Sequence, residues 1–455
     1  MQLPPSLIQS LQSTPGFDEN EFIQTHQSGQ QITSIRLNPI KFDVQHSTFN
    51  IDERVPWSSH GYYLKERPSF TLDPLFHAGA YYVQEASSMF LEEAIKQSCE
   101  LSKPIRVLDL CAAPGGKSTL IQSIISENSL LVSNELIKAR ANILAENITK
   151  WGAANVVVTN NDAKDFQRLP SFFDLIVADA PCSGSGLFRK DPAAIDEWSL
   201  NNVALCSQRQ QKILADVMDA LKPGGILIYS TCSYSTEEDE TICDWLLQNY
   251  DLHSLPLKIK NEWNIIETIS PVSHAHGFRF HPDKVKGEGF FIAVFKKAAG
   301  SFQSKEIKSK LKPVSLNKTA LEIAQTFIQH PDSFSFIVWQ QEVLVIPAAI
   351  YEWFLQVQAA LYIKKAGVKL GSIIRHELVP HHEWALSSIR SNKMQCVELE
   401  EQTALDYLRR KDIKINADTT GWALVSFKGL SLGLIKILPS RINNYYPKDW
   451  RILNK

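Results

Sequence analysis

The sequence predicts a doubly wound α/β domain with a mostly parallel sheet in the middle of the chain. Between Ile105 and Lys297, short apolar stretches alternate with segments whose apolar residues recur at helical spacing. Apolar stretches without polar alternation are typical of parallel strands that are covered on both faces. A third observation is the glycine turn at 114–116, which separates the first apolar stretch from the helical segment after it. Sheets of this class bind ligands at such turns.

Six strands and four helices are expected in this domain. The expected strands are IRVLDL (105–110), SLLVSNE (129–135), NVVVTNN (155–161), FDLIVADA (173–180), GGILIYS (224–230) and GFFIAVFKK (289–297). The expected helices lie at 118–126, 136–150, 199–221 and 237–248. The sheet therefore begins with the strand that leads into the glycine turn.

Changes of composition divide the chain into four expected parts. These are a small α+β domain at 1–75, the central domain at 76–297, a lysine-rich linker at 298–312 and a C-terminal region at 313–455. The first part mixes helical patterns at 6–12 and 18–26 with a strand-like stretch at 32–37. The last part has strand candidates at 334–340 and 342–347 and a helix candidate at 349–361.

The composition is that of a globular protein and excludes several classes. Of the 455 residues, 44% are hydrophobic and 21% are charged. No stretch approaches the roughly 18 apolar residues of a membrane span, and the start MQLPPSLIQSLQS lacks a secretion signal, so a cytoplasmic protein without membrane contact is expected. Seven cysteines without a CxxC pair argue against structural disulfides and a zinc ribbon. His381 and His382 are expected in a solvated loop, and no metal site is expected.

Charge is distributed unevenly along the chain. From Ser301 onward the sequence has 21 lysine and arginine residues against 14 aspartate and glutamate residues, whereas residues 1–300 have 26 against 35. The formal net charge of −2 is thus the sum of an acidic segment, residues 1–300, and a basic segment, residues 301–455. This distribution favours a polyanion as the partner of the C-terminal part.

The glycine turn belongs to the stretch LDLCAAPGGKST (108–119). Its last residues are similar to the end of a nucleotide P-loop, GxxxxGK[ST], but the first glycine of that motif, six residues before Lys117, is replaced by Cys111. A phosphate cradle needs that glycine, so an NTPase is disfavoured.

Acidic residues follow the next three strands of the predicted sheet. Glu135 stands where an acid would bind ribose hydroxyls, Asp162 follows the third strand, where it can meet an adenine edge, and Asp179 closes the fourth. Carboxylates would repel a pyrophosphate, whereas they are compatible with a positively charged sulfonium that carries a ribose and an adenine. Each acid alone could instead be a helix N-cap. Together they indicate S-adenosyl-L-methionine as the cofactor.

Two of the seven cysteines stand on polar loops at the carboxyl edge of the predicted sheet, where open α/β sheets bind ligands. Cys182 lies in DAPCSGSG (179–186), and Cys232 lies in STCSYS (230–235). The other five are expected to be small buried hydrophobes, namely Cys99, Cys111, Cys206, Cys243 and Cys396.

Two thiols beside a methyl donor indicate methylation of cytosine at carbon 5. This carbon is a poor nucleophile until a thiolate adds to carbon 6 and converts the ring to an enamine. An acid near ring N3 stabilises the charge that develops, and Asp179 is placed for this contact. A base must then remove the carbon 5 proton so that the thiol can leave. Spacing alone leaves open which of the two cysteines attacks.

Four stretches resemble motifs of the Nol/Nop/Sun (Fmu) family of RNA cytosine-C5 methyltransferases. They are LDLCAAPGGKST, DAPCSGSGLFRKDP, STCSYSTEEDE and GFRFHPDKVKGEGFFIAVFKK, and they span most of residues 76–297. The resemblance implies a Rossmann-like S-adenosylmethionine-dependent methyltransferase fold. It implies that Cys232, in the TC motif, is the nucleophile and that Cys182, in the PC motif, assists product release. The cofactor contacts that it implies are Cys111, Ala112, Ala113, Pro114, Gly115, Gly116, Lys117, Glu135, Asp162 and Asp179.

Within this family the chain is more similar to RsmF-type than to RsmB-type enzymes. FRKDP (188–192) after the first cysteine loop, the start LPPSLIQSL (3–11) and a long C-terminal extension carry this similarity. The segment INNYYPKDWR (442–451) resembles the closing strand of a PUA-like module. The resemblance therefore implies a C-terminal PUA-like RNA-binding region and 16S ribosomal RNA, or the small ribosomal subunit, as the partner.

Basic and aromatic side chains near the C-terminus are expected to hold structured RNA. In the last 28 residues only Asp449 is acidic, and the relevant side chains are Lys428, Lys436, Arg441, Tyr445, Tyr446, Lys448, Trp450, Arg451 and Lys455. Arg189 and Lys190, beside Cys182, are expected either to steer a phosphate of the target or to lie in a solvated turn. The target cytosine must leave its stack to reach a thiol in a cleft.

The sequence thus predicts methylation of carbon 5 of a cytosine in 16S ribosomal RNA through a covalent cysteine–cytosine intermediate. The same chemistry on transfer RNA is the alternative within enzymes. A catalytically inactive RNA-binding assembly factor is disfavoured by the intact Cys182, Cys232 and Asp179. A DNA methyltransferase is also disfavoured, because it would use the PC cysteine as its nucleophile and would not need Cys232.

Overall fold

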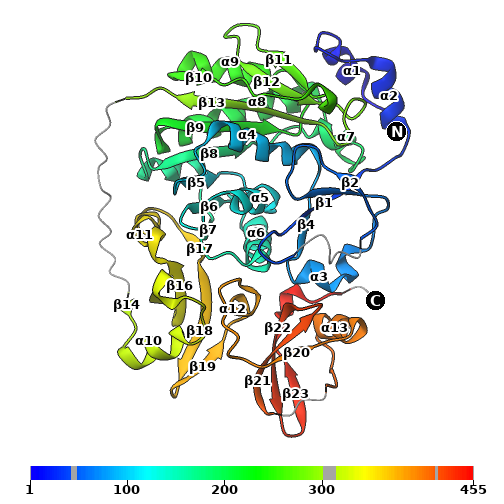
Figure 1. Cartoon of the computed structure of the whole chain (residues 1–455). Helices are drawn as coiled ribbons and strands as arrows, with labels where there is room; N and C mark the ends of the chain where they lie inside the picture. Colours follow the sequence, from blue (N-terminus) through cyan, green and yellow to red (C-terminus); the bar gives the residue numbers. More distant parts are fainter. Residues whose placement is uncertain (1, 43–48, 301–313, 416–418, 454–455) are drawn as a thin grey trace.

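The computed structural model describes residues 2–42, 49–300, 314–415 and 419–453. Four sheets organise this part of the chain, one with ten strands, one with five and two with four. In Figure 1 the ten-stranded sheet occupies the upper half of the molecule, the N-terminal helices and sheet lie along its right side, and the two C-terminal sheets lie below it.

The ten-stranded sheet is built around a parallel core. Strands β7, β6, β5, β8 and β9 lie side by side in this order and run parallel. Antiparallel strands β13, β12, β11 and β10 extend the edge at β9, and β17 extends the edge at β7. The strands are β5 (Arg106–Asp109), β6 (Leu130–Asn134), β7 (Val156–Thr159), β8 (Phe173–Asp179), β9 (Leu221–Thr231), β10 (Leu252–Ser254), β11 (Ile266–Ile269), β12 (His276–Phe280), β13 (Phe290–Lys297) and β17 (Ile363–Ala366). The strand order reverses between β5 and β8, so their carboxyl ends form the ligand-binding switch point of the sheet.

The six strands predicted for the central domain are confirmed as β5, β6, β7, β8, β9 and β13. Strands β10, β11 and β12 are not among the predictions; β10 and β11 are short, and each carries an exposed polar residue, His253 and Glu267. Strand β17 is also unexpected. It comes from the C-terminal region and pairs with β7, so that region contributes directly to the main sheet.

Helices cover both faces of this sheet. On one face lie α4 (Leu91–Ser98), α5 (Gly116–Ile124) and α6 (Lys138–Trp151), and on the other lie α8 (Leu200–Val217) and α9 (Glu240–Asn249). Val107 of β5 belongs to the core beneath α5 and α6, whereas Leu108 belongs to the core beneath α8 and α9. Both faces of the strand are therefore buried, which explains its continuous apolar sequence. The predicted helix at 199–221 ends at Val217, because a 3₁₀ turn (Met218–Ala220) leads directly into β9.

The N-terminal part combines two helices with a four-stranded antiparallel sheet. Helices α1 (Pro5–Leu11) and α2 (Glu19–Gln27) and strand β1 (Thr33–Leu37) match the predicted elements. The sheet has the order β2-β3-β1-β4, with β2 (Ile51–Arg54), β3 (Gly61–Leu64) and β4 (Tyr81–Val83), and α3 (Pro74–His77) precedes β4. The sheet thus extends beyond residue 75, and β4 brings it to the edge of the main domain.

The C-terminal region forms two further sheets. The five-stranded sheet has the order β14-β15-β16-β18-β19, and the four-stranded sheet has the order β20-β21-β22-β23. Their strands are β14 (Val314–Ser315), β15 (Phe334–Trp339), β16 (Glu342–Pro347), β18 (Val368–Ile374), β19 (Glu377–Pro380), β20 (Cys396–Glu398), β21 (Gly421–Phe427), β22 (Leu430–Leu438) and β23 (Arg441–Asn444). The helices are α10 (Lys318–Gln325), α11 (Tyr351–Ala360), α12 (His382–Leu386) and α13 (Glu401–Leu408). The two predicted strands and the predicted helix here correspond to β15, β16 and α11, and residues 301–312 of the predicted linker lie outside the described residues.

The last sheet shares a hydrophobic core with the N-terminal sheet, which includes Leu37, Tyr81, Tyr407 and Tyr446. Tyr446 is fully buried, and its hydroxyl lies 3.3 Å from Nδ1 of His77. The prediction that Tyr446 is available to stack on a base is therefore wrong. Of the remaining predicted residues, Lys455 lies outside the described part, and those with exposed side chains are Lys428, Arg441, Tyr445, Lys448 and Arg451.

No helix within the described ranges is long and apolar enough to cross a membrane.

Candidate active site

The glycine turn lies between β5 and α5, at the switch point of the sheet. Gly115 has φ of +119°, a conformation that favours glycine, and it leaves α5 without a side-chain cap at its N-terminus. The loop borders a cavity of about 150 Å³ that is also lined by Asp179 and by residues 82–85 of the N-terminal part. Of the predicted cofactor residues, this cavity contacts Cys111, Ala112, Ala113, Pro114, Gly116, Lys117 and Asp179. Tyr82, Gln84 and Glu85 are site residues that sequence reasoning missed.

The ends of β5, β6 and β7 are tied together by one side chain. The amide of Asn134 donates to the carbonyl oxygens of Leu110 (3.1 Å) and Asn161 (3.0 Å). Glu135, the next residue, is buried and pairs with Arg140 at 3.5 Å, and Arg140 also donates to the Ala113 carbonyl at 2.8 Å. The structure therefore links Glu135 to the glycine loop.

Asp162 does not line the cofactor cavity. Its side chain accepts a hydrogen bond from the Lys164 amide at 3.2 Å and begins a 3₁₀ helix (Ala163–Arg168) with a capping box. This is the helix-cap role that the sequence offered as the alternative for each acid.

An ion pair stands between the glycine loop and the end of β8. Lys117 Nζ lies 2.7 Å from Asp179 Oδ2, and Asp179 Oδ1 accepts a hydrogen bond of 2.8 Å from the Ser230 hydroxyl. Burial disfavours the charged form of Lys117, but the Asp179 carboxylate outweighs it, so the pKa of Lys117 is raised above its ordinary value. The site therefore holds a fixed positive charge, and Cys232 is close enough to contribute to this electrostatic balance.

The two loop cysteines, Cys182 and Cys232, are brought into contact. Their sulfur atoms lie 3.1 Å apart, and both residues are partly buried. The hydrogen bond with Cys232, followed by burial, raises the pKa of the Cys182 thiol well above its usual range. Either sulfur atom can be the donor in this contact.

A buried carboxylate, Glu238, holds the two cysteine loops together. It accepts hydrogen bonds from the backbone N–H of Ser183 (2.8 Å), the hydroxyl of Ser183 (2.5 Å), the hydroxyl of Ser233 (2.6 Å) and the amide of Gln210 (3.1 Å). We call Glu238 with Ser183, Ser233 and Gln210 the Glu238 cluster. Since Ser183 follows Cys182 and Ser233 follows Cys232, the cluster fixes the separation of the two sulfur atoms.

Backbone contacts reinforce this arrangement. The Gly186 N–H donates to the Cys232 carbonyl at 2.8 Å, and a Cβ at Gly186 would come within 2.8 Å of the same oxygen. Only glycine allows the loops to approach so closely. Arg279 of β12 donates to the Tyr234 carbonyl at 2.9 Å and pairs with Asp239 at 3.1 Å, which supports the second loop from below.

Three other predictions are wrong. Arg189 is buried and donates to the carbonyls of Gln30 (2.6 Å) and Gly287 (3.2 Å), so it joins the N-terminal part to the main domain and is not free to steer a phosphate. His382 is buried between Tyr446 and Trp450 and does not lie in a solvated loop. Cys396 is exposed, whereas Cys206 and Cys243 are buried as expected.

The described residues contain no group of three or more histidine, cysteine, aspartate or glutamate side chains that could hold a metal ion.

The fold and the site define a class of protein. A Rossmann-like sheet with a glycine turn at its switch point, carboxylates beside that turn and a pair of thiols on the same edge is the arrangement of a methyltransferase that binds a nucleoside cofactor.

Comparisons with known proteins identify the family. A model described as 16S rRNA methyltransferase RsmB/F matches residues 99–296, the N-terminal domain of RsmF matches 3–86, and the RsmF PUA domain matches 395–452. Ribosomal RNA small subunit methyltransferase F from Aeromonas salmonicida (strain A449) is 31% identical over 447 residues, which cover 91% of this chain and 90% of that protein. The protein of the same name from Shewanella piezotolerans (strain WP3) is 30% identical, with the same coverage.

Two solved structures share the fold. A methyltransferase homolog protein from Pyrococcus horikoshii is 28% identical, with a TM-score of 0.52, and the match covers 65% of this chain and 100% of that one. NSun6 from Pyrococcus horikoshii with SFG is 19% identical, with a TM-score of 0.54, and the match covers 65% of this chain and 99% of that one. The chain belongs to the RsmF family of ribosomal RNA methyltransferases, and its cofactor is S-adenosyl-L-methionine.

The residues of the cavity suit this cofactor. The uncapped N-terminus of α5 carries partial positive charge and favours a carboxylate such as that of a methionine moiety. The Asp179 carboxylate, which also lines the cavity, favours a positively charged sulfonium or ammonium. Glu135, which is linked to the loop through Arg140, has hydrogen-bond acceptors for hydroxyl groups.

Proposed function

We propose that this protein methylates carbon 5 of a cytosine in 16S ribosomal RNA through a covalent bond between Cys232 and the base. The observation that carries the proposal is the contact of 3.1 Å between the sulfur atoms of Cys182 and Cys232, beside the Lys117–Asp179 ion pair. A single thiol would suffice for packing, whereas two thiols in contact at the cofactor edge suit a reaction that needs both a nucleophile and a second proton-transfer group.

Cys232 is the better nucleophile of the pair. Because the pKa of the Cys182 thiol is raised, we assign Cys182 the donor role in the contact with Cys232, and a hydrogen-bond donor stabilises a thiolate there. The positive charge of Lys117 acts in the same direction. The thiolate adds to carbon 6, so that an S–C6 bond forms and the electron pair of the C5=C6 bond moves into the ring.

The Lys117–Asp179 pair is placed to stabilise the base during this addition. We assign Asp179 the contact with ring N3, and the Lys117 ammonium, 2.7 Å from it, supplies positive charge where negative charge develops. S-adenosyl-L-methionine, when bound, supplies the electrophilic methyl group that carbon 5 accepts. The residues proposed to hold it are the 111–117 loop, Glu135 and Asp179, together with Asp162, although that side chain caps a 3₁₀ helix and does not line the cavity.

Cys182 serves in the release of the product. The carbon 5 proton must leave to a base, its bonding electrons restore the C5=C6 bond, and the S–C6 bond breaks to return the thiolate to Cys232. At this stage the Cys232 sulfur is bonded to carbon 6 and carries no negative charge. Its contact therefore no longer raises the pKa of Cys182. Cys182 can then pass its own proton to solvent and, as a thiolate, accept the proton from carbon 5.

The flanking parts are proposed to hold the RNA. We propose an N-terminal domain at 1–75, whose sheet is completed by the later strand β4, a catalytic domain at 76–297, a linker at 298–312, and an RNA-binding region at 313–455, from which β17 joins the catalytic sheet. The exposed cations of the last sheet, such as Lys428, Arg441 and Arg451, suit contacts with phosphates, and the exposed Tyr445 beside Trp422 suits contacts with an unstacked base.

The proposal is tested by nucleoside mass spectrometry. Purified protein, S-adenosyl-L-methionine and 16S ribosomal RNA without prior methylation should yield 5-methylcytidine, and Cys232→Ala should yield none. Methylation of another atom of cytosine, or of another base, would refute the chemistry. Formation of 5-methylcytidine in transfer RNA but not in ribosomal RNA would show that transfer RNA is the substrate.

A further inference from the structure

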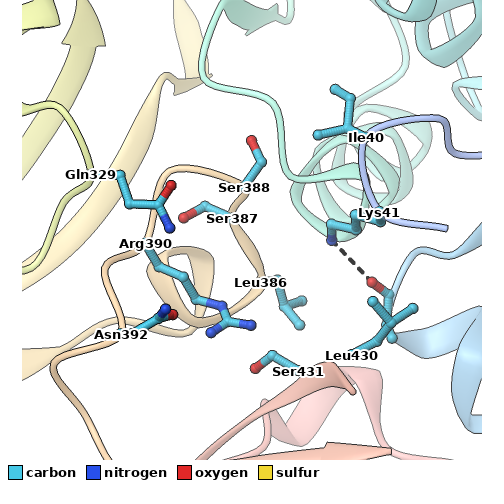
Figure 2. Close-up of a pocket in the computed structure, with 11 residues that line it drawn as sticks. Ile40, Lys41, Gln329, Leu386, Ser387, Ser388, Arg390, Asn392, Leu430 and Ser431 are labelled. Atoms are coloured by element: carbon cyan, nitrogen blue, oxygen red, sulfur yellow. Dashed lines mark hydrogen bonds between the residues drawn. The ribbon is translucent and has the colours of Figure 1, made fainter. Parts of the chain in front are cut away.

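A polar cavity of about 230 Å³ lies between the N-terminal part and the C-terminal region, and it shares no lining residue with the cofactor cavity (Figure 2). Its walls come from the segment after β1, from the start of β22 and from the loop after α12. We call it the seam cavity. Two of its lining residues, Lys41 and Arg390, are cationic, and none of the described residues that line it is acidic.

The two cations differ in how they are held. Lys41 Nζ donates to the carbonyls of Ala78 (3.0 Å) and Lys150 (2.6 Å), so it closes the C-terminal end of α6, where positive charge is favourable. An ammonium has three N–H donors, which leaves one for another partner. Lys41 alone could thus be explained as a helix cap.

Arg390 has no such explanation. Its guanidinium makes no hydrogen bond or ion pair with any residue that the structure describes, and the residue is half-buried. Figure 2 shows Arg390 and Lys41 approaching the cavity from opposite sides. A guanidinium offers five donors in a planar fork that matches a carboxylate or a phosphate.

A third group in the seam cavity also lacks a partner. Ser431 is 6% exposed, it lines the cavity, and its hydroxyl oxygen is buried without a hydrogen bond in the described structure. A buried hydroxyl of this kind usually has a partner. Burial and, secondly, the charge of Arg390 lower the pKa of Lys41 to about 7, so the apposed cations are unfavourable unless an anion joins them.

We infer that the seam cavity binds a phosphate group, held by the Arg390 fork, the free donor of Lys41 and the hydroxyl of Ser431. The shared chemistry is a tetrahedral oxyanion. A phosphodiester of the RNA substrate is the favoured source, which rests on the proposed function, and free phosphate is the other. Ser388 at the rim is exposed, so the cavity opens to solvent and a nucleic acid can reach it. A phosphate bound here would contact the N-terminal part through Lys41 and the C-terminal region through Arg390 and Ser431, and it would favour one arrangement of these two parts around the RNA.

The first arm of the test uses the full-length protein and inorganic phosphate without RNA. Thermal unfolding is followed in phosphate and in chloride at equal ionic strength. Phosphate should raise the melting temperature of the wild type and should have no such effect on Arg390→Gln. Arg375→Gln is the matched control, because Arg375 is an exposed arginine of the same region at the turn between β18 and β19.

The second arm measures affinity for a 16S ribosomal RNA fragment across a series of salt concentrations. Loss of one phosphate contact in Arg390→Gln should weaken binding about tenfold and reduce the slope of log K against log salt by about 0.7. Ser431→Ala is a second, milder variant that removes only a hydroxyl, and it should weaken binding about threefold. The control Arg375→Gln should change the slope less than Arg390→Gln does.

The outcomes separate the sources of the anion. A phosphate effect that Arg390→Gln abolishes, together with an unchanged RNA slope, would assign the cavity to free phosphate. No phosphate effect and wild-type RNA binding in Arg390→Gln would overturn the inference. Arg375→Gln, at an exposed residue outside the seam cavity, should form 5-methylcytidine at the wild-type rate. If the wild type forms none, the proposed chemistry fails while both binding arms still decide this inference.

Discussion

The Glu238 cluster and the seam cavity are both polar, but they differ in whether the protein itself supplies partners for their polar groups. In the Glu238 cluster one carboxylate accepts four hydrogen bonds, and each donor belongs to the same chain. In the seam cavity Arg390 and the Ser431 hydroxyl have no partner among the described residues. Satisfied polar networks rigidify a structure, whereas unsatisfied groups are costly until a ligand or water pairs with them. The Glu238 cluster therefore positions catalytic groups, whereas the seam cavity is suited to bind a ligand.

The largest expected effect comes from breaking the Glu238 cluster. Glu238→Ala removes the acceptor that the two cysteine loops share, so the sulfur atoms should lose their fixed separation and kcat should fall about 100-fold. Glu238→Gln keeps one oxygen acceptor but loses the charge, and kcat should fall about tenfold. Affinity for S-adenosyl-L-methionine should change little, because Glu238 does not line the cofactor cavity.

Glu237→Gln is the matched control for this prediction. Glu237 is the exposed neighbour of Glu238, so its substitution should leave kcat unchanged. Steady-state methylation and calorimetric titration with the cofactor separate the two parameters. A Glu238→Ala enzyme that folds and retains the wild-type kcat would show that the cluster does not position the thiols.

The second prediction concerns acid stability on the C-terminal side of the seam cavity. Burial first, and then the nearby charges of His381, Lys150 and Lys41, lower the pKa of His382 to about 3. Its folded pKa lies below its unfolded value, so its contribution to stability is complete above about pH 6.5 and is lost as the pH falls toward 3. At pH 5 this loss should be about 2 kcal/mol relative to neutral pH.

The variant His382→Phe tests this assignment, since phenylalanine cannot be protonated and keeps the aromatic contacts with Tyr446 and Trp450. Urea unfolding of the variant between pH 7 and pH 5 should lose about 2 kcal/mol less stability than the wild type. Equal losses in the two proteins would show that the acid sensitivity arises elsewhere.

The smallest predicted effect compares two serines directly. Ser233→Ala removes a hydrogen bond of 2.6 Å to Glu238 and should destabilise the protein by about 1 to 2 kcal/mol. Ser431→Ala removes a hydroxyl that has no partner and should leave stability unchanged or raise it slightly in buffer without phosphate. Urea unfolding of both variants measures the difference. A larger loss for Ser431→Ala would mean that the seam cavity is already satisfied within the protein.

Much of the active site could be predicted from the sequence because its motifs are local. The glycine turn and the two cysteines stand at the ends of strands that are recognisable as apolar stretches, and parallel strands bring their carboxyl ends together. The contact between the two sulfur atoms follows from β8 and β9 being neighbours. By contrast, Glu238 stands in an acidic run from Glu237 to Glu240, and no local pattern indicates which of these carboxylates is buried against the cysteine loops.

The parts that the sequence did not predict depend on contacts between distant segments. Strand β17 joins the main sheet from the C-terminal region, and β4 brings Tyr82 and Glu85 to the cofactor cavity from the N-terminal part. Lys41 and Arg390 line one cavity only because the N-terminal part and the C-terminal region pack together. His382 and Tyr446 are polar residues in basic or aromatic segments, and their burial follows from the shared core of the first and last sheets.

The most direct test of the account is the mass of the intact protein after incubation with ribosomal RNA and S-adenosyl-L-methionine. In Cys182→Ala the nucleophile remains but product release is blocked, so a covalent protein–RNA adduct should accumulate, which nuclease treatment trims to a nucleotide on a peptide that contains Cys232. Cys232→Ala should give neither adduct nor 5-methylcytidine. An adduct in Cys232→Ala, attached at Cys182, would contradict the assignment of the nucleophile.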